Sequence, residues 1–237
     1  MLDYNVIMRE SLQFDQILSE ELKYMSLYYH LMGINTTQMK YKKDGHNYFK
    51  DPIDDNCEDF AKEKQTLEYV IKRKWDGSVG IGATLGWKKL RALDIDGVFI
   101  YTHNDPDISE KVAGGIYRYD CDPNSHFPFL LNDILSVLNL PLNYPWVTIS
   151  GSYKGFHILF YCDDIDESFD AKAYSPSDNC LEQGFPFFDH IELRWREHLV
   201  LSPSLHKDGG RYRFLNKQLP TTDILSVNFR NCFDFIQ

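Results

Sequence analysis

The stretch "LRALDIDGVF", residues 90–99, places two aspartates inside a run that otherwise has the composition of a buried β-strand. Side chains alternate between the two faces of a strand, so Asp94 and Asp96 share one face, two residues apart. Two carboxylates in an apolar setting need a positive partner. A hard divalent cation such as Mg²⁺ suits them because it takes oxygen ligands. The alternative is a pair of acids at a solvent-exposed strand end.

The composition indicates a globular protein. The chain has 237 residues, of which 43% are hydrophobic and 15% aromatic, enough for one large domain or two closely packed subdomains. Five cysteines without a CxxC pair predict reduced thiols in a cytoplasmic protein, and no zinc site is legible. We find no signal peptide and no apolar run of membrane-spanning length, so no membrane partner is expected.

The charge of the chain argues both for and against binding of nucleic acid. The net charge of −10 argues against a broad attraction to a phosphate backbone. Basic residues nevertheless concentrate in "YKKDGHNYFK" (41–50) and "KEKQTLEYVIKRKW" (62–75). These two segments are either a solvated face or the path of a nucleic-acid template.

The periodicity of apolar residues predicts a mixed α/β (α+β) chain. Helical spacing predicts helices over residues 12–32 and 61–74, separated by a polar, turn-rich segment at 35–59. A further helix is expected near 128–138. Short β-branched or aromatic runs predict strands at 90–101, 145–151, 155–162, 190–195 and 197–204. This order predicts a sheet with helices on one face.

The stretch "TISGSYKGFHILFYC", residues 148–162, has the form of a phosphate cradle. A strand ends at Ser150, a glycine-bounded turn carries Lys154, and the next strand begins near His157. Backbone amides, an ammonium and an imidazole there could face one anion. The alternative is an ordinary hairpin turn with a structural histidine.

The stretch "HIELRWREHLVLSPSLHKDGGRYRF", residues 190–214, supplies a third acid and a polar loop. Glu192 lies between Ile191 and Leu193, where an unpaired charge would be costly. The following loop presents hydroxyl, imidazole and basic groups: Ser202, Ser204, His206, Arg211, Tyr212 and Arg213. The alternative is a turn followed by an edge strand.

Together these three stretches resemble the bifunctional primase-polymerase (prim-pol) branch of the archaeo-eukaryotic primase superfamily. That branch has a strand motif hhDhDG, a glycine-rich motif ending in G-h-H, and a later acidic strand followed by a P-S-x-H loop. Here "ALDIDG" (92–97), "SGSYKGFH" (150–157) and "IELR…LSPSLHKDGGRY" (191–212) occur in the same order. The resemblance covers about residues 25–220. Ser152 and Lys154 stand where the family commonly has Gly and Arg.

The resemblance implies a fold and a set of site residues. It implies a single catalytic domain over 1–237, with an N-terminal α/β part (about 1–90) packed on a palm-like sheet (about 90–220) related to the RNA-recognition motif. Asp94, Asp96 and Glu192 would be catalytic and would hold two Mg²⁺ or Mn²⁺ ions. The nucleotide would be bound by Lys154, His157, Ser150, Gly155, Ser204 and His206.

The implied activity is that of a DNA primase and DNA polymerase, a template-directed nucleotidyltransferase. Its partners would be a single-stranded DNA template, a primer and dNTPs or NTPs, with a helicase on another domain or chain. Such domains occur in plasmid, phage, mobile-element and CRISPR-associated replication proteins, and the apolar C-terminal sequence would fit a domain cut from a longer protein. Two alternatives stay open: a replication-initiation nucleic-acid-binding module and a metal-dependent nuclease.

Overall fold

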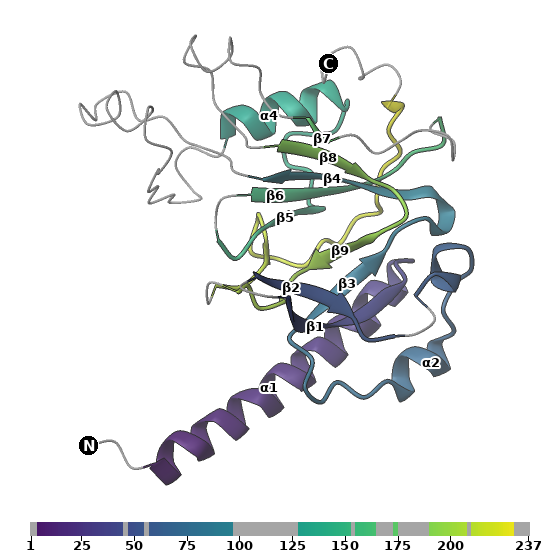
Figure 1. Cartoon of the computed structure of the whole chain (residues 1–237). Coiled ribbons are helices and arrows are strands. Elements are labelled where there is room, and N and C mark those ends of the chain that lie inside the picture. Colours follow the sequence, from purple (N-terminus) through teal and green to yellow (C-terminus); the bar gives the residue numbers. More distant parts are fainter. Residues whose placement is uncertain are drawn as a thin grey trace, which may run out of the picture.

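The computed structural model shows a mixed α+β fold built on two sheets and two main helices (Figure 1). Every ladder between strands in the described part of the chain is antiparallel. The structure describes residues 4–44, 47–54, 57–96, 128–152, 155–164, 173–174, 190–207 and 210–229.

The smaller sheet has four strands in the order β2-β1-β3-β9. These are β1 (Thr36–Asp44), β2 (Asn47–Pro52), β3 (Gly80–Thr84) and β9 (His198–Leu201). β9 comes from the C-terminal half of the chain but pairs with β3, with Ile81 opposite Leu201. This pairing ties the end of the chain to the N-terminal sheet.

The larger sheet has six strands in the order β10-β5-β6-β4-β8-β7. Its strands are β4 (Leu90–Asp96), β5 (Val147–Ile149), β6 (Gly155–Tyr161), β7 (Ala173–Tyr174), β8 (His190–Arg194) and β10 (Arg213–Phe214). The helix α4 (Pro128–Val137) lies on the side of this sheet away from the smaller sheet (Figure 1). β4 is central and almost wholly buried, which makes its two aspartates conspicuous.

The long helix α1 (Tyr4–Leu31) packs against the smaller sheet through one apolar stripe. Leu18, Leu22, Met25 and Tyr29 recur at spacings of three and four residues and are buried in the core. The helix ends in a Schellman motif: the amide of Ile34 donates to the Tyr29 carbonyl and that of Gly33 to the His30 carbonyl. Gly33 has a φ of +84°, which explains the glycine at this position.

Three short helical segments complete the described chain: η1 (Asp59–Ala61), α2 (Leu67–Lys72) and η2 (Trp87–Lys89). The helix expected at 61–74 is therefore reduced to α2, because the Thr66 hydroxyl caps its start by accepting from the Tyr69 amide. In the described part of the chain, no helix has both the length and the apolar character needed to cross a membrane.

Two other expectations about the N-terminal half were wrong. The segment 35–59 was predicted to be polar and turn-rich, yet it contains β1 and β2, which form an antiparallel hairpin. β3 was not predicted. By contrast, the predicted helix near 128–138 and the strands beginning near 90, 145, 155, 190 and 197 are all observed. Residues 97–101 of the first of these predicted strands lie outside the described residues.

Candidate functional site

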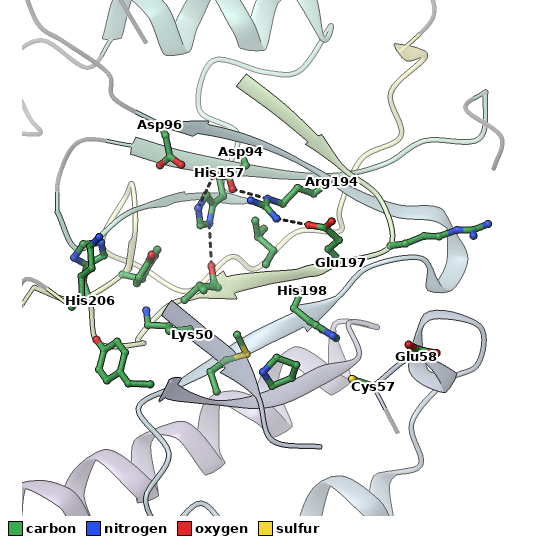
Figure 2. Close-up of a pocket in the computed structure, with 18 residues that line it drawn as sticks. Lys50, Cys57, Glu58, Asp94, Asp96, His157, Arg194, Glu197, His198 and His206 are labelled. Carbon is green, nitrogen blue, oxygen red and sulfur yellow. Dashed lines mark hydrogen bonds and ion pairs between the residues drawn. The ribbon is translucent and has the colours of Figure 1, made fainter. Parts of the chain in front are cut away.

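A cleft of about 630 Å³ lies between the two sheets. Its upper wall in Figure 2 is formed by side chains of β4, β6 and β8, and its lower wall by β1, β2 and β9. The predicted site residues Asp94, Asp96, His157 and His206 all line it. The volume falls in the range of small-molecule sites.

The strand register gathers three predicted residues in one row. Asp94 is directly opposite His157 on β6 and directly opposite Glu192 on β8. Residues that face each other across antiparallel strands project to the same side of the sheet. The row of His157, Asp94 and Glu192 therefore faces the smaller sheet, as the two-residue spacing of the aspartates requires of Asp96 as well.

Asp96 lies against a glycine that leaves it room. Asp96 is opposite Gly155, and a Cβ added at Gly155 would come within 2.9 Å of the Asp96 Oδ1 and 2.6 Å of the Ile95 carbonyl oxygen. Any other residue at position 155 would push the carboxylate or the strand away. Because Gly155 has no side chain, the Asp96 carboxylate can lie directly against it.

Asp94 has two positive partners within the protein. Its Oδ1 lies 3.0 Å from His157 Nε2, and its Oδ2 accepts a hydrogen bond of 2.7 Å from Arg194 Nε. Burial opposes ionisation of Asp94, but attraction to His157 and Arg194 outweighs it and lowers the pKa of the carboxyl to about 2. The positive charge that the sequence requires beside Asp94 is therefore present in Arg194.

Arg194 joins three carboxylates. Besides Asp94, its guanidinium contacts Glu192 Oε2 at 2.8 Å and also pairs with Glu197 (Figure 2 labels the last pair). Burial lowers the pKa of Arg194, but the surrounding carboxylates, led by Asp94, raise it overall. Arg194 is thus a permanent cation held among acids at the edge of the cleft.

His157 is held from both sides of its ring. Nδ1 lies 3.0 Å from the Val200 carbonyl oxygen on β9, while Nε2 faces Asp94. Both partners can only accept a hydrogen bond, so both ring nitrogens donate when His157 is an imidazolium. This side chain links the two sheets across the cleft.

The opposite wall carries a lysine with no acceptor. Lys50 Nζ is buried, lies 4.1 Å from the centroid of the Tyr212 ring, and has no hydrogen-bond partner among the described residues. Burial lowers the pKa of Lys50 to about 7. Burial and the nearby Asp94 and Asp96 raise the pKa of Tyr212, so its hydroxyl stays protonated.

Tyr212 stands at the centre of a basic cluster formed by Lys50, His157 and His206. The centroids of the His157 and His206 rings lie 5.6 Å and 5.7 Å from that of Tyr212. The backbone fixes the loop that carries His206, because its amide donates to the Gly210 carbonyl at 2.7 Å. Three basic side chains thus border one aromatic ring in the cleft.

Four predicted site residues do not line the cleft. Ser204 is fully buried behind it: its hydroxyl accepts from the Ile81 amide at 2.8 Å and donates to the Ile81 carbonyl at 3.1 Å. Ser150 is buried and bonds the Ser152 hydroxyl at 2.9 Å. Glu192 pairs with Arg194, which lines the cleft, but does not itself line it. Gly155 lies opposite Asp96 on the neighbouring strand β6.

One further predicted residue, Lys154, lies outside the described residues. The sequence interpretation also missed two side chains that the fold brings to the site. Arg194 lies two residues after Glu192 on the same strand, so the alternation of side chains would have placed it on the same face as Glu192. Lys50 belongs to the basic segment 41–50, but nothing local connects that segment with β4.

The donor set is suitable for a hard cation. Asp94, Asp96 and Glu192 offer the carboxylate oxygens that Mg²⁺ or Mn²⁺ prefers. Within the described ranges, however, no three His, Cys, Asp or Glu side chains are grouped closely enough to hold a metal ion. Arg194 bridges Asp94 and Glu192, so a cation bound by both acids would replace this arginine as their counter-ion.

Comparison of the chain with protein-family models found no match, and comparison with curated proteins found none either. Function therefore has to be inferred from the side chains in the cleft and their chemistry.

Proposed function

We propose that this chain is a template-directed nucleotidyltransferase, a DNA primase and DNA polymerase that uses nucleoside triphosphates on a single-stranded template. One observation carries the proposal. Three segments separated by long stretches of sequence bring Asp94, His157 and Glu192 into one row across β4, β6 and β8. That juxtaposition is what the resemblance to primase-polymerases requires.

The topology of the larger sheet supports a palm-like arrangement. Among the described elements, β4 is followed by α4 and then by β5, yet β6 lies between β4 and β5 in the sheet. The order β5-β6-β4-β8 is that of the split β-α-β arrangement shared by ferredoxin-like and RNA-recognition-motif folds. In such a sheet the central strands present their residues on one open face, which here faces the cleft.

Each side chain has a distinct role in this proposal. Asp94, Asp96 and Glu192 would hold the divalent cations. A bound divalent cation would supply activation of the attacking 3′-hydroxyl and neutralisation of the leaving pyrophosphate. His157, whose ring nitrogens face Val200 and Asp94, would have to exchange one of these partners for a phosphate oxygen of the nucleotide in order to stabilise its negative charge.

A nucleic-acid-binding replication module without synthesis is the second candidate. It is favoured by the ion pairs of Arg194, which already satisfy both Asp94 and Glu192 without a metal ion. In this candidate Asp94 and Glu192 stabilise the fold through Arg194, and the cleft binds the phosphates or bases of a nucleic-acid strand.

A primer-extension and de novo priming assay distinguishes the two. We would test single-stranded DNA with Mg²⁺ or Mn²⁺ and with either dNTPs or NTPs, comparing the wild type with Asp96→Asn. Asp163→Asn is the matched control, since Asp163 is exposed and pairs only weakly with the exposed Lys89, 3.7 Å away. We expect products from the wild type and the control and none from Asp96→Asn.

A folded wild type that makes no product under any of these conditions would contradict the polymerase proposal. Equal product from Asp96→Asn and the wild type would contradict the assignment of Asp96 as a ligand of the divalent cations. Retained binding of single-stranded DNA without synthesis would favour the second candidate.

A further inference from the structure

The lower wall of the cleft contains a buried charge that nothing in the described structure compensates. Lys50 enters from β2, and its Nζ has almost no solvent exposure and no hydrogen-bond acceptor. Its Nζ lies 4.1 Å from the centroid of the Tyr212 ring and 6.0 Å from that of the Tyr41 ring.

This environment satisfies an ammonium only in part. An ammonium group has three N–H donors, and the face of one aromatic ring can engage one of them. A buried donor without an acceptor costs free energy, and a buried charge without a partner costs more. The lowered pKa of Lys50, about 7, expresses the same cost. An anionic ligand would remove it.

The neighbours of Lys50 indicate what kind of anion would fit. His157 and His206 border the same Tyr212 ring, and Lys207 also lines the cleft. Several basic side chains around one point favour a ligand with several negative charges rather than a single carboxylate. The carboxylates of Asp94 and Asp96 on the opposite wall would repel an anionic group. The negatively charged part of the ligand would therefore lie on the side of Lys50.

We propose that Lys50 is a nucleotide-binding residue whose ammonium contacts the di- or triphosphate group of the nucleotide bound in the cleft. The identity of the ligand as a nucleotide rests on the proposed function. The contact joins the two sheets through the ligand, because Lys50 belongs to the smaller sheet and the acidic row to the larger one. The smaller sheet then takes part in substrate binding and does not only support the fold.

The test uses pyrophosphate as the probe, measured by isothermal titration calorimetry with the same Mg²⁺ concentration for every variant, so that only the side chain at position 50 differs. The variants are Lys50→Met, which keeps the length and removes the charge, and Lys50→Arg, which keeps the charge. Lys40→Met is the matched control, because Lys40 lies on neighbouring β1, is exposed and does not line the cleft. Circular dichroism and thermal unfolding check that each variant is folded.

We expect Lys50→Met to weaken pyrophosphate binding by roughly tenfold to a hundredfold, the range for a lost hydrogen bond to a charged group. Lys40→Met should stay within about twofold of the wild type, and Lys50→Arg should recover most of the loss. Equal affinity of Lys50→Met and the wild type would overturn the proposal, because the cation–π contact would then be the whole role of Lys50. A folded wild type that does not bind pyrophosphate would overturn it as well.

The outcome is independent of polymerase activity. Loss of pyrophosphate binding in Lys50→Met together with no primer extension by the wild type would support the Lys50 contact and contradict the proposed function. Primer extension by the wild type with unchanged pyrophosphate binding in Lys50→Met would support the proposed function and contradict the Lys50 contact.

Discussion

The two walls of the cleft hold buried charge in opposite ways. On the wall formed by β4, β6 and β8, Asp94 has an ionised carboxyl with a positive group at each oxygen. On the wall formed by β1 and β2, Lys50 has an ammonium with an aromatic face beside it and no acceptor. The pKa values diverge accordingly: that of Asp94 falls to about 2, which favours its charge, and that of Lys50 falls to about 7, which disfavours it.

The difference separates groups that stabilise the fold from groups that depend on a ligand. A buried carboxylate between an arginine and a histidine is compensated within the protein, so its removal should cost stability. A buried ammonium without an acceptor is not compensated, so its removal should cost binding and not stability. Substitutions on each wall can test this distinction.

The largest effect is expected from Asp94→Ala. The change leaves His157 and Arg194 without the carboxylate between them, and breaking a buried ion pair from one side is strongly destabilising. We expect the free energy of unfolding, measured with urea, to fall by about 3 kcal/mol. Asp163→Ala, on the exposed surface, should change it by less than about 0.5 kcal/mol. A similar small change for both variants would show that the Asp94 pairs do not stabilise the fold.

The second prediction concerns acid unfolding. Because the pKa of Asp94 is lower in the folded chain than the ordinary value near 4, its ionised form stabilises the fold above about pH 4. This contribution, about 2–3 kcal/mol, should disappear as the pH falls toward about 2. The stability difference between wild type and Asp94→Asn, measured from pH 6 to pH 2, isolates it from other acids. A difference that stays constant over that range would contradict the assigned pairs.

Ser204→Ala tests a residue that lies behind the cleft. The hydroxyl of Ser204 is the acceptor for the buried Ile81 amide, so its loss leaves that donor unsatisfied. We expect the free energy of unfolding to fall by about 1–2 kcal/mol, while pyrophosphate affinity stays within about twofold. A large loss of pyrophosphate affinity in a folded Ser204→Ala protein would instead place this hydroxyl in the ligand site, as the resemblance implies.

The smallest effect, and one of opposite sign, is expected from Lys50→Met. Methionine removes the buried ammonium, so the free energy of unfolding at pH 7 should rise by about 1 kcal/mol. Since the pKa of Lys50 is lower in the folded chain than in the unfolded one, wild-type stability rises between pH 7 and pH 10. The advantage of Lys50→Met should therefore shrink over that interval in urea titrations. A destabilised variant would mean that the contact with Tyr212 outweighs the cost of burial.

The upper wall could be predicted from the sequence because its signals are local. Alternation within "ALDID" fixed Asp94 and Asp96 on one face of a buried strand, and the structure confirms that strand as β4. The position of Glu192 opposite Asp94 is a long-range pairing that no spacing reveals, and only the order of motifs suggested it.

The lower wall could not be predicted in the same way. β1 and β2 carry many lysines and polar residues, so the segment reads as a solvated turn region although it forms a long hairpin. β3 has the sequence GIGAT, in which glycine lowers strand propensity. Gly80 is nevertheless required, because a Cβ there would lie 2.4 Å from the Ser204 Oγ. Contacts with distant residues such as Ser204 therefore stabilise β3 as a strand. β3 pairs with β1, and β1 pairs with β2, the strand that carries Lys50.

The measurement that tests the central claim most directly is steady-state nucleotide incorporation on a primed single-stranded template by the wild type, Asp96→Asn, Lys50→Met and Asp163→Asn. If the two walls act together on one nucleotide, Asp96→Asn should lose kcat by a hundredfold or more, as expected for loss of transition-state stabilisation. Lys50→Met should chiefly raise the KM for the nucleotide, and Asp163→Asn should match the wild type. Wild-type rates in both cleft variants, or no incorporation by any of the four folded proteins, would contradict the assignment of this cleft as a polymerase site.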